Sequence, residues 1–104
     1  YIHIDDLASA HESAITYLQT SSNSITVNCG YNKGHSVKEV VEAFHKLNKT
    51  FEVTHAERRA GDAPYLVADN SLILRNFDWQ PQKQDLKYII SSAYDWEKNL
   101  KETM

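Results

Sequence analysis

The stretches that favour β-strand in this chain are few, short and far apart, and this limits the sheet that the chain can build. Residues 25–29 and 51–55 are β-branched or alternate apolar and polar side chains, and the opening residues 1–4 and a brief piece at 65–67 are the others. A sheet needs three or more paired strands to be stable by itself. We therefore expect strands whose partners lie outside these residues, and a chain that begins inside a strand is expected to be a piece of a longer protein.

Four segments carry helical signals, so the fold class that the sequence predicts is α/β, with about four helices and three or four short strands. Apolar residues recur at helical spacing. The stripes are Leu7, Ala10, Ala14, Ile15 and Leu18; Val37, Val40, Val41, Phe44 and Leu47; and Leu86, Ile89, Ile90, Ala93, Trp96 and Leu100. A short helix with Leu72, Ile73 and Leu74 is predicted before Pro81.

Polar residues mark where these helices begin. Asp5 or Asp6 is expected to cap the first helix, which explains this carboxylate pair without acid–base chemistry. Ser36 and Glu39 have the spacing of a capping box. Asp69 is expected to cap the short helix, and the last helix is expected to begin near Asp85.

Composition excludes some classes of protein. The 104 residues fit one domain, with 41% hydrophobic and 24% charged residues. A net charge of −3 argues against nucleic-acid binding, and no apolar run approaches the roughly 18 residues of a membrane span. Cys29 is the single cysteine, so no intrachain disulfide forms, and a reducing cytoplasmic location is expected.

The common motifs of catalysis and cofactor binding do not occur in this sequence. It contains neither G-x-G-x-x-G nor G-x-x-x-x-G-K-[ST], and its five histidines do not pair at the spacing of metal ligands. Cys29, at the end of a predicted strand, is interpreted as a small buried hydrophobe and not as a reactive thiol. The sequence therefore predicts no catalytic, cofactor-binding or metal-binding residue.

The charged loop 57–64 is the best candidate for a binding site. It contains Arg58-Arg59-Ala60-Gly61-Asp62. A guanidinium matches the oxygens of a phosphate, and a carboxylate can accept a hydrogen bond from a ribose hydroxyl. Gly61 would allow a turn with positive φ. The alternative is a solvated loop with a local Arg–Asp pair, which contributes little energy.

Four motifs in order resemble the UDP-glucose 4-epimerases of the extended short-chain dehydrogenase/reductase superfamily. Residues 1–11 resemble the family's Y-I-H-V-x-D-L-A-x-A-H. Residues 28–40 resemble N-L-G-x-G-x-G-x-S-V-x-E-V, residues 58–69 resemble R-R-x-G-D-x(5)-A-D, and residues 77–81 with the last helix resemble L-G-W-x-P and the helix after it. Departures include Cys29 in place of Leu, Lys33 and His35 in the glycine loop, residues 72–76 in place of a polar helix, and Phe77-Asp78 in place of Leu-Gly.

The resemblance implies a fold and a place in a larger enzyme. Members pair an N-terminal Rossmann domain that binds NAD with a smaller part that binds the nucleotide sugar. They oxidise the sugar at C4, let the keto sugar rotate, and return the hydride to the other face. Residues 1–104 would be one C-terminal substrate-binding fragment without the Rossmann core, and residues 1–30 would pack on that domain. We therefore expect an exposed apolar patch, with oligomerisation or low stability of the fragment.

The resemblance also assigns roles to three residues. Arg59 matches the arginine that contacts the diphosphate, Asp62 matches the carboxylate that contacts the uridine ribose, and Leu66 matches a pocket position whose size bears on N-acetylated sugars. The expected substrate is a UDP-sugar, the full enzyme would use NAD as a dimer, and the fragment alone would be inactive. A dehydratase, reductase or decarboxylase of the same superfamily and a non-catalytic nucleotide-binding module stay open as alternatives.

Overall fold

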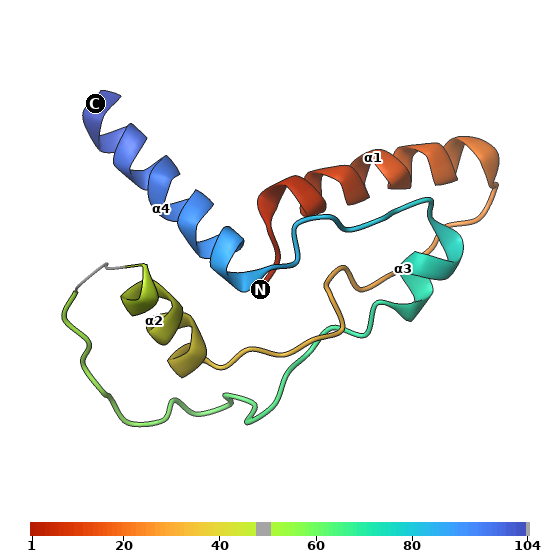
Figure 1. Ribbon diagram of the computed structural model, residues 1–104. Helices are drawn as coiled ribbons and strands as arrows, with labels where there is room; N and C mark the ends of the chain where they lie inside the picture. The colour runs from red at the N-terminus through yellow and green to blue at the C-terminus, as the bar shows by residue number, and fades with distance from the viewer. Residues whose placement is uncertain (48–50, 104) are drawn as a thin grey trace.

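Four α-helices joined by extended segments make up the computed structural model, which describes residues 1–47 and 51–103 (Figure 1). The helices are α1 (Ile4–Thr20), α2 (Val37–Lys46), α3 (Ser71–Asn76) and α4 (Leu86–Thr103). Residues 51–70 form a long, mostly extended segment that leads to α3, and residues 77–85 form a second one that joins α3 to α4. The four predicted helices are therefore present.

The predicted α/β class is wrong, because the described residues contain helices and no strand. Residues 25–29 keep a strand-like alternation: Ile25, Val27 and Cys29 are half-buried, whereas Thr26 and Asn28 are exposed. An extended segment becomes a strand only when a neighbour completes its ladder of hydrogen bonds. The described part of the chain offers these residues no such neighbour, and residues 51–55 are exposed throughout.

The start of α1 differs from the sequence prediction in both its position and its cap. The helix begins at Ile4, inside the predicted opening strand, and the cap is His3 instead of Asp5 or Asp6. The His3 Nδ1 accepts a hydrogen bond from the Asp5 backbone N–H at 3.0 Å. The ring proton is then on Nε2, which lies 3.0 Å from Ser92 Oγ and can donate to it. His3 thus joins the first turn of α1 to α4.

The other helix starts agree closely with the sequence pattern. The capping box of Ser36 and Glu39 opens α2 as predicted. Asp85 precedes α4, and its side chain accepts from the Lys87 backbone N–H at 3.3 Å. Asn70 is the N-cap of α3 where Asp69 was predicted, although Asp69 Oδ1 accepts from the Ser71 backbone N–H at 3.0 Å.

The core is small and lies between α1, α3 and the segment that follows α3. Its buried members are Ala10, Ile73, Phe77 and Trp79. The rings of Tyr17 and Phe77 lie 5.2 Å apart between centroids, and Ile25, Val27 and Cys29 pack against the same cluster. The predicted apolar stripes are thus only partly buried.

A network around the buried carboxylate of Asp6 joins three distant parts of the chain. Asp6 Oδ2 accepts from the Tyr31 hydroxyl at 2.6 Å and from the Lys83 backbone N–H at 3.0 Å. Asp6 Oδ1 accepts from the Gln82 backbone N–H at 3.0 Å. The Trp79 indole N–H lies 3.0 Å from the Asp6 carbonyl oxygen. This Asp6 network, made by Asp6, Tyr31, Gln82 and Lys83, ties α1 to residue 31 and to the segment before α4.

The molecule is more open than a compact domain of its size. Its radius of gyration is 16.9 Å, whereas a compact chain of 100 residues has about 13 Å. Its accessible surface is 8505 Å², and a compact monomer of this mass exposes about 5,900 Å². Much apolar surface is exposed, including 59% of Ile15 and 59% of Leu18. Ile15 and Leu18 thus belong to a predicted apolar stripe but lie on the surface of the described chain.

Candidate functional site

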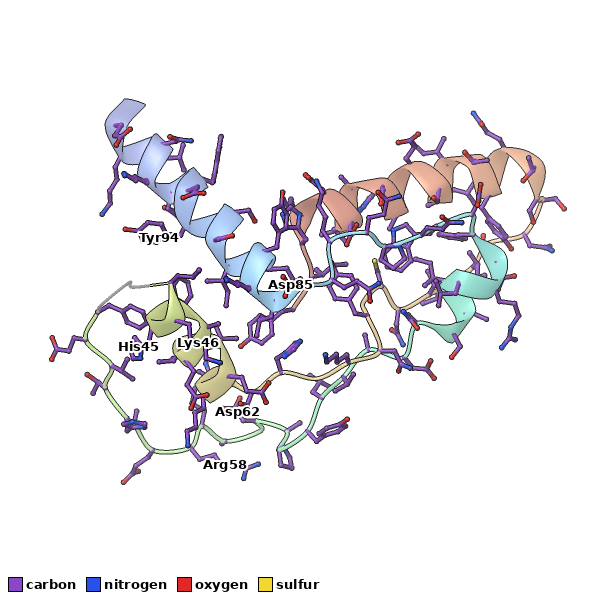
Figure 2. The ribbon with its side chains drawn as sticks, in the orientation of Figure 1. His45, Lys46, Arg58, Asp62, Asp85 and Tyr94 are labelled. Carbon is purple, nitrogen blue, oxygen red and sulfur yellow. The ribbon has the colours of Figure 1, made fainter. Side chains whose placement is uncertain are left out.

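The charged loop 57–64 forms a tight turn held by its own arginines. Arg58 Nη2 donates to the Asp62 carbonyl oxygen at 2.8 Å, and Arg59 Nε donates to Asp62 Oδ2 at 3.0 Å. Gly61 has a φ of +87°, and the sequence analysis expected this glycine to allow such a positive value. Figure 2 shows Arg58 and Asp62 on the extended segment that leads to α3. The turn therefore brings two guanidinium groups and one carboxylate together.

All three residues predicted to bind the substrate face solvent. The side chains of Arg59 and Asp62 are 85% and 45% exposed, and Leu66 is 88% exposed. A guanidinium carries five N–H donors, so the pair with Asp62 uses only part of the capacity of Arg59. The ion pair itself contributes little to stability, because both groups are well hydrated. The structure brings Arg59 and Asp62 together but leaves Leu66 outside that pair.

Both ends of the exposed segment 51–66 lie against other parts of the chain. At one end, the ring of Phe51 lies 5.5 Å from that of Phe44 and 5.3 Å from that of His45 in α2, between centroids. At the other end, Ala68 and Val67 approach Gly30 and Gly34 closely. The charged loop therefore lies between two contacts with the rest of the chain: Phe51 against α2, and Val67 and Ala68 against Gly34 and Gly30.

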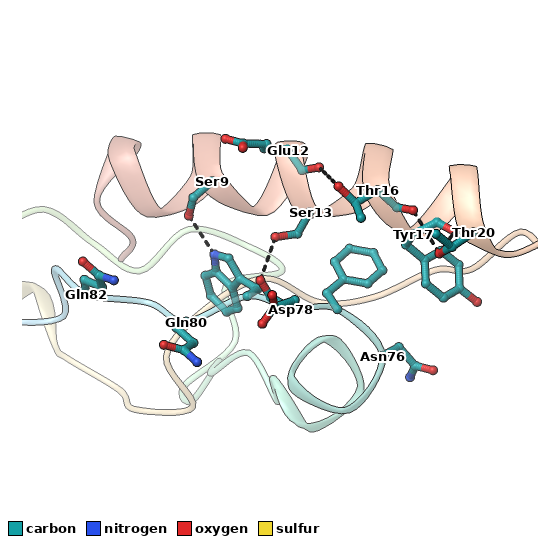
Figure 3. Close-up of a pocket in the computed structure, with 12 residues that line it drawn as sticks. Ser9, Glu12, Ser13, Thr16, Tyr17, Thr20, Asn76, Asp78, Gln80 and Gln82 are labelled. Carbon is teal, nitrogen blue, oxygen red and sulfur yellow. Dashed lines mark hydrogen bonds between the residues drawn. The ribbon is translucent and has the colours of Figure 1, made fainter.

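A cavity lies elsewhere, between α1 and the segment that joins α3 to α4 (Figure 3). Its volume is about 600 Å³, and hydroxyl, amide and carboxyl groups are prominent in its wall. Several of its hydroxyls make hydrogen bonds within the chain; Ser13 Oγ, for example, donates to the Asp78 carbonyl oxygen at 3.2 Å. Arg59, Asp62 and Leu66 do not line it. We therefore take the charged loop, and not this cavity, as the candidate site.

Two groups that could carry chemistry in other settings have structural surroundings here. Burial raises the pKa of the Cys29 thiol, and the nearby Asp6 charge raises it further, so Cys29 is a thiol at neutral pH. Burial, followed by the hydrogen bond to Asp6, raises the pKa of Tyr31 to about 12. The interpretation of Cys29 as a packed small side chain agrees with its contact with the core.

The glycines of this chain do not form a dinucleotide-binding turn. Such a turn needs a glycine-rich approach of the backbone to a pyrophosphate at a helix start. Gly30 and Gly34 instead lie against Ala68 and Val67, and Gly61 lies in the charged loop. The described residues therefore do not fit NAD.

The described residues also give no sign of a metal site or a membrane span. Within 1–47 and 51–103, no three His, Cys, Asp or Glu side chains are grouped so that they could hold a metal ion. None of the helices described is long and apolar enough to cross a membrane.

Sequence reasoning missed the structural importance of Tyr31 and Asp6. Asp6 was interpreted as a cap because it follows an apolar stretch, and Tyr31 lies in a loop with no pattern of its own. The Asp6 network spans up to 77 residues of sequence separation. No local pattern could have predicted these contacts.

Comparisons with known proteins give a consistent set of relatives. No family model matches the chain. The chain is 39% identical over 105 residues to the UDP-glucose 4-epimerase of Azospirillum brasilense, and the match covers 100% of this chain and 30% of that protein. It is 42% identical over 97 residues to the UDP-glucose 4-epimerase of Rhizobium meliloti (strain 1021), covering 92% of this chain and 29% of the relative.

A solved structure extends the match to three dimensions. The chain superposes on the UDP-Glc/GlcNAc 4-epimerase of Campylobacter jejuni with a TM-score of 0.83 and 47% sequence identity. The match covers 94% of this chain and 30% of that structure. The chain thus spans about 30% of the length of the relatives that it matches.

Proposed function

This chain belongs to the UDP-glucose 4-epimerase family and matches the C-terminal part of its members, and from this premise we propose that it supplies part of a UDP-sugar-binding wall. In this proposal Arg59 contacts the diphosphate, Asp62 accepts a hydrogen bond from the uridine ribose, and Leu66 borders the sugar. The charged loop carries the proposal. Arg59 Nε lies 3.0 Å from Asp62 Oδ2, and this closeness of a guanidinium and a carboxylate supports a shared site for a phosphate and a ribose hydroxyl.

The charge and exposure of the loop support this role. A diphosphate needs cationic donors that are not buried in the protein's own contacts, and the Arg59 side chain is mostly exposed. The substrate would compete with Asp62 for Arg59, and an exposed ion pair costs little to rearrange. The loop is therefore open to an anionic ligand.

The remainder of the site is assigned to other parts of the complete enzyme. In this proposal an N-terminal Rossmann domain would hold NAD, which would supply the hydride chemistry at C4 of the sugar. The isolated 104 residues should then have no epimerase activity, because hydride chemistry needs that cofactor. The proposal includes a homodimeric complete enzyme in the reducing cytoplasm.

The open shape of the chain is consistent with a large covered surface in such an enzyme. The accessible surface exceeds that of a compact monomer by about 2,500 Å². An apolar groove of about 390 Å³ lies between α1 and residues 25–29. In the proposal, residues 1–30 pack on the Rossmann domain through this groove, and 25–29 would gain there the strand partner that they lack here.

The test is a kinetic comparison in the complete protein that contains these residues. We expect interconversion of UDP-glucose and UDP-galactose by the wild type. Arg59→Ala should raise KM for the UDP-sugar roughly 10- to 100-fold, because a hydrogen bond to a charged group is lost. Arg75→Ala removes the same charge from an exposed position at the end of α3 and should leave KM unchanged.

Several results would contradict the proposal. They are absence of epimerase activity in the complete protein, an unchanged KM in Arg59→Ala, or turnover by the isolated chain. Assays with UDP-N-acetylglucosamine decide the sugar, since the relative from Campylobacter jejuni carries both sugars in its name. Micromolar binding of UDP to the isolated chain would instead favour a binding module.

A further inference from the structure

Two glycines lie so close to the segment after the charged loop that neither position has room for a side chain. A methyl group on Gly30 would lie 2.7 Å from Ala68 Cβ, and one on Gly34 would lie 2.8 Å from Val67 Cγ2. Carbon atoms in contact lie about 3.5–4.0 Å apart. Ala68 has no side-chain rotation to relieve such an overlap, and the β-branched Val67 is stiff. We name these two approaches the glycine contacts.

The glycine contacts rest on a firmly held segment. Asn70 Nδ2 donates to the Gly30 carbonyl oxygen at 3.0 Å in a buried position. The neighbouring Tyr31 is bonded to Asp6 at 2.6 Å and accepts from the His3 backbone N–H at 3.0 Å. Tyr31 thus ties this part of the chain to α1, and the Asn70 bond holds the start of α3 beside Gly30. A group added at either glycine would therefore displace residues 65–68, which lie between that bond and the exposed loop.

Residues 65–68 carry Leu66 and continue directly from the charged loop. Residues 51–66 are all exposed, so the packing of this stretch comes from its ends. A displacement of Val67 or Ala68 would therefore move Leu66 directly and would shift the end of the charged loop, which has no other packing contact nearby among the described residues.

We propose that Gly30 and Gly34 are positioning residues for the substrate site, because the glycine contacts fix where Leu66, Asp62 and Arg59 meet the UDP-sugar. This inference rests on the proposed function. Neither glycine touches substrate in this scheme. Both act through Val67 and Ala68, so their role should be visible in KM and should be restored by removing the group that blocks them.

The first experiment is a double-mutant cycle in the complete enzyme with Gly34→Ala and Val67→Ala. Gly34 is exposed, so the single variant should fold. We expect Gly34→Ala to raise KM for UDP-glucose about tenfold, since a small misplacement of a binding group has effects of this size or larger. The kcat should stay within about threefold, because the reacting groups lie elsewhere. Adding Val67→Ala should return KM to that of Val67→Ala alone.

A second pair keeps the inference testable if Gly34→Ala does not fold. Gly30→Ala should raise KM in the same way, and Gly30→Ala with Ala68→Gly moves one methyl group across the contact and should restore it. The amide NMR chemical shifts of residues 65–68 should change in each single variant and return toward the wild-type values in each double variant. This readout does not depend on substrate.

The outcomes separate the two proposals. If the wild-type enzyme neither binds UDP nor epimerises UDP-sugars, the proposed function is wrong. The positioning role of the glycines is then wrong as well. An active wild type whose glycine variants keep the same KM overturns the positioning role alone. A raised KM that the second substitution does not restore also overturns it, because it would show a general loss of structure.

Discussion

Asp6 is the residue on which most of the long-range contacts of this chain converge. Its carboxylate accepts from Tyr31, Gln82 and Lys83. Asp6→Asn replaces one acceptor oxygen with an NH₂ group that faces a donor, so we expect a loss of about 1–3 kcal/mol in the free energy of unfolding. Urea unfolding measures this loss. Asp5→Asn is the matched control, since the Asp5 side chain is 57% exposed and its contacts are an ion pair with Lys83 and a 4.0 Å approach to His3 Nδ1. Equal losses in the two variants would contradict the assignment.

The same carboxylate predicts a loss of stability in acid. Burial pushes the pKa of Asp6 upward, but the hydrogen bonds from Tyr31, Gln82 and Lys83 outweigh it, so the pKa lies below its ordinary value of 3.8. A lowered pKa means that ionised Asp6 stabilises the fold above pH 3.8 and that this contribution is lost as the pH falls through the folded-state pKa. The gap in urea midpoint between wild type and Asp6→Asn should therefore narrow below that pH. A gap that stays constant down to pH 2 would count against Asp6 as the titrating group.

At the scale of elements, α2 shows how much the capping box at its N-terminus contributes to the stability of the helix. Ser36 Oγ accepts from the Glu39 backbone N–H at 3.1 Å, and Glu39 Oε1 lies 3.4 Å from the Ser36 N–H that donates to it. Ser36→Ala should destabilise α2 by about 1 kcal/mol, because the Glu39 amide loses its acceptor. Faster hydrogen exchange of the Glu39 and Val40 amides would report this loss. Ser36→Asp keeps an acceptor and should exchange like the wild type; equal exchange in Ser36→Ala and wild type would rule out the cap.

The helices could be predicted from sequence because their signals are local. The apolar spacing in 7–18 and 86–100 and the Ser36–Glu39 box lie within a few turns of the residues that they organise. Strand formation depends on a partner, so the prediction of a strand from the β-branched residues 25–29 was wrong: the described chain holds no partner for them, and they stay extended. In the candidate site, too, the local feature could be predicted from the sequence and the long-range contacts could not. The turn with positive φ at Gly61 followed from five neighbouring residues, whereas the glycine contacts join positions 33 and 38 residues apart.

At the scale of the whole molecule, the exposed apolar surface predicts the behaviour of the chain in isolation. Ile15 and Leu18 lie on α1 with more than half of their surface exposed, and α1 borders the apolar groove with residues 25–29. Apolar patches of this kind favour association or reduce stability. We expect the isolated chain to sediment above its monomer mass of 11.9 kDa, or to melt broadly at low temperature.

Substitution of the exposed positions distinguishes these causes. Ile15→Lys with Leu18→Lys removes apolar surface while keeping good helix formers, so it should yield a monomer with unchanged helix content. Thr16→Lys with Thr20→Lys adds the same charge at exposed polar positions of α1 and should leave self-association in place. Analytical ultracentrifugation and circular dichroism measure both properties. A wild-type chain that sediments as a monomer and melts in one sharp transition at high temperature would show that the exposed face needs no partner, and the packing of residues 1–30 on a further domain would then lose its physical basis.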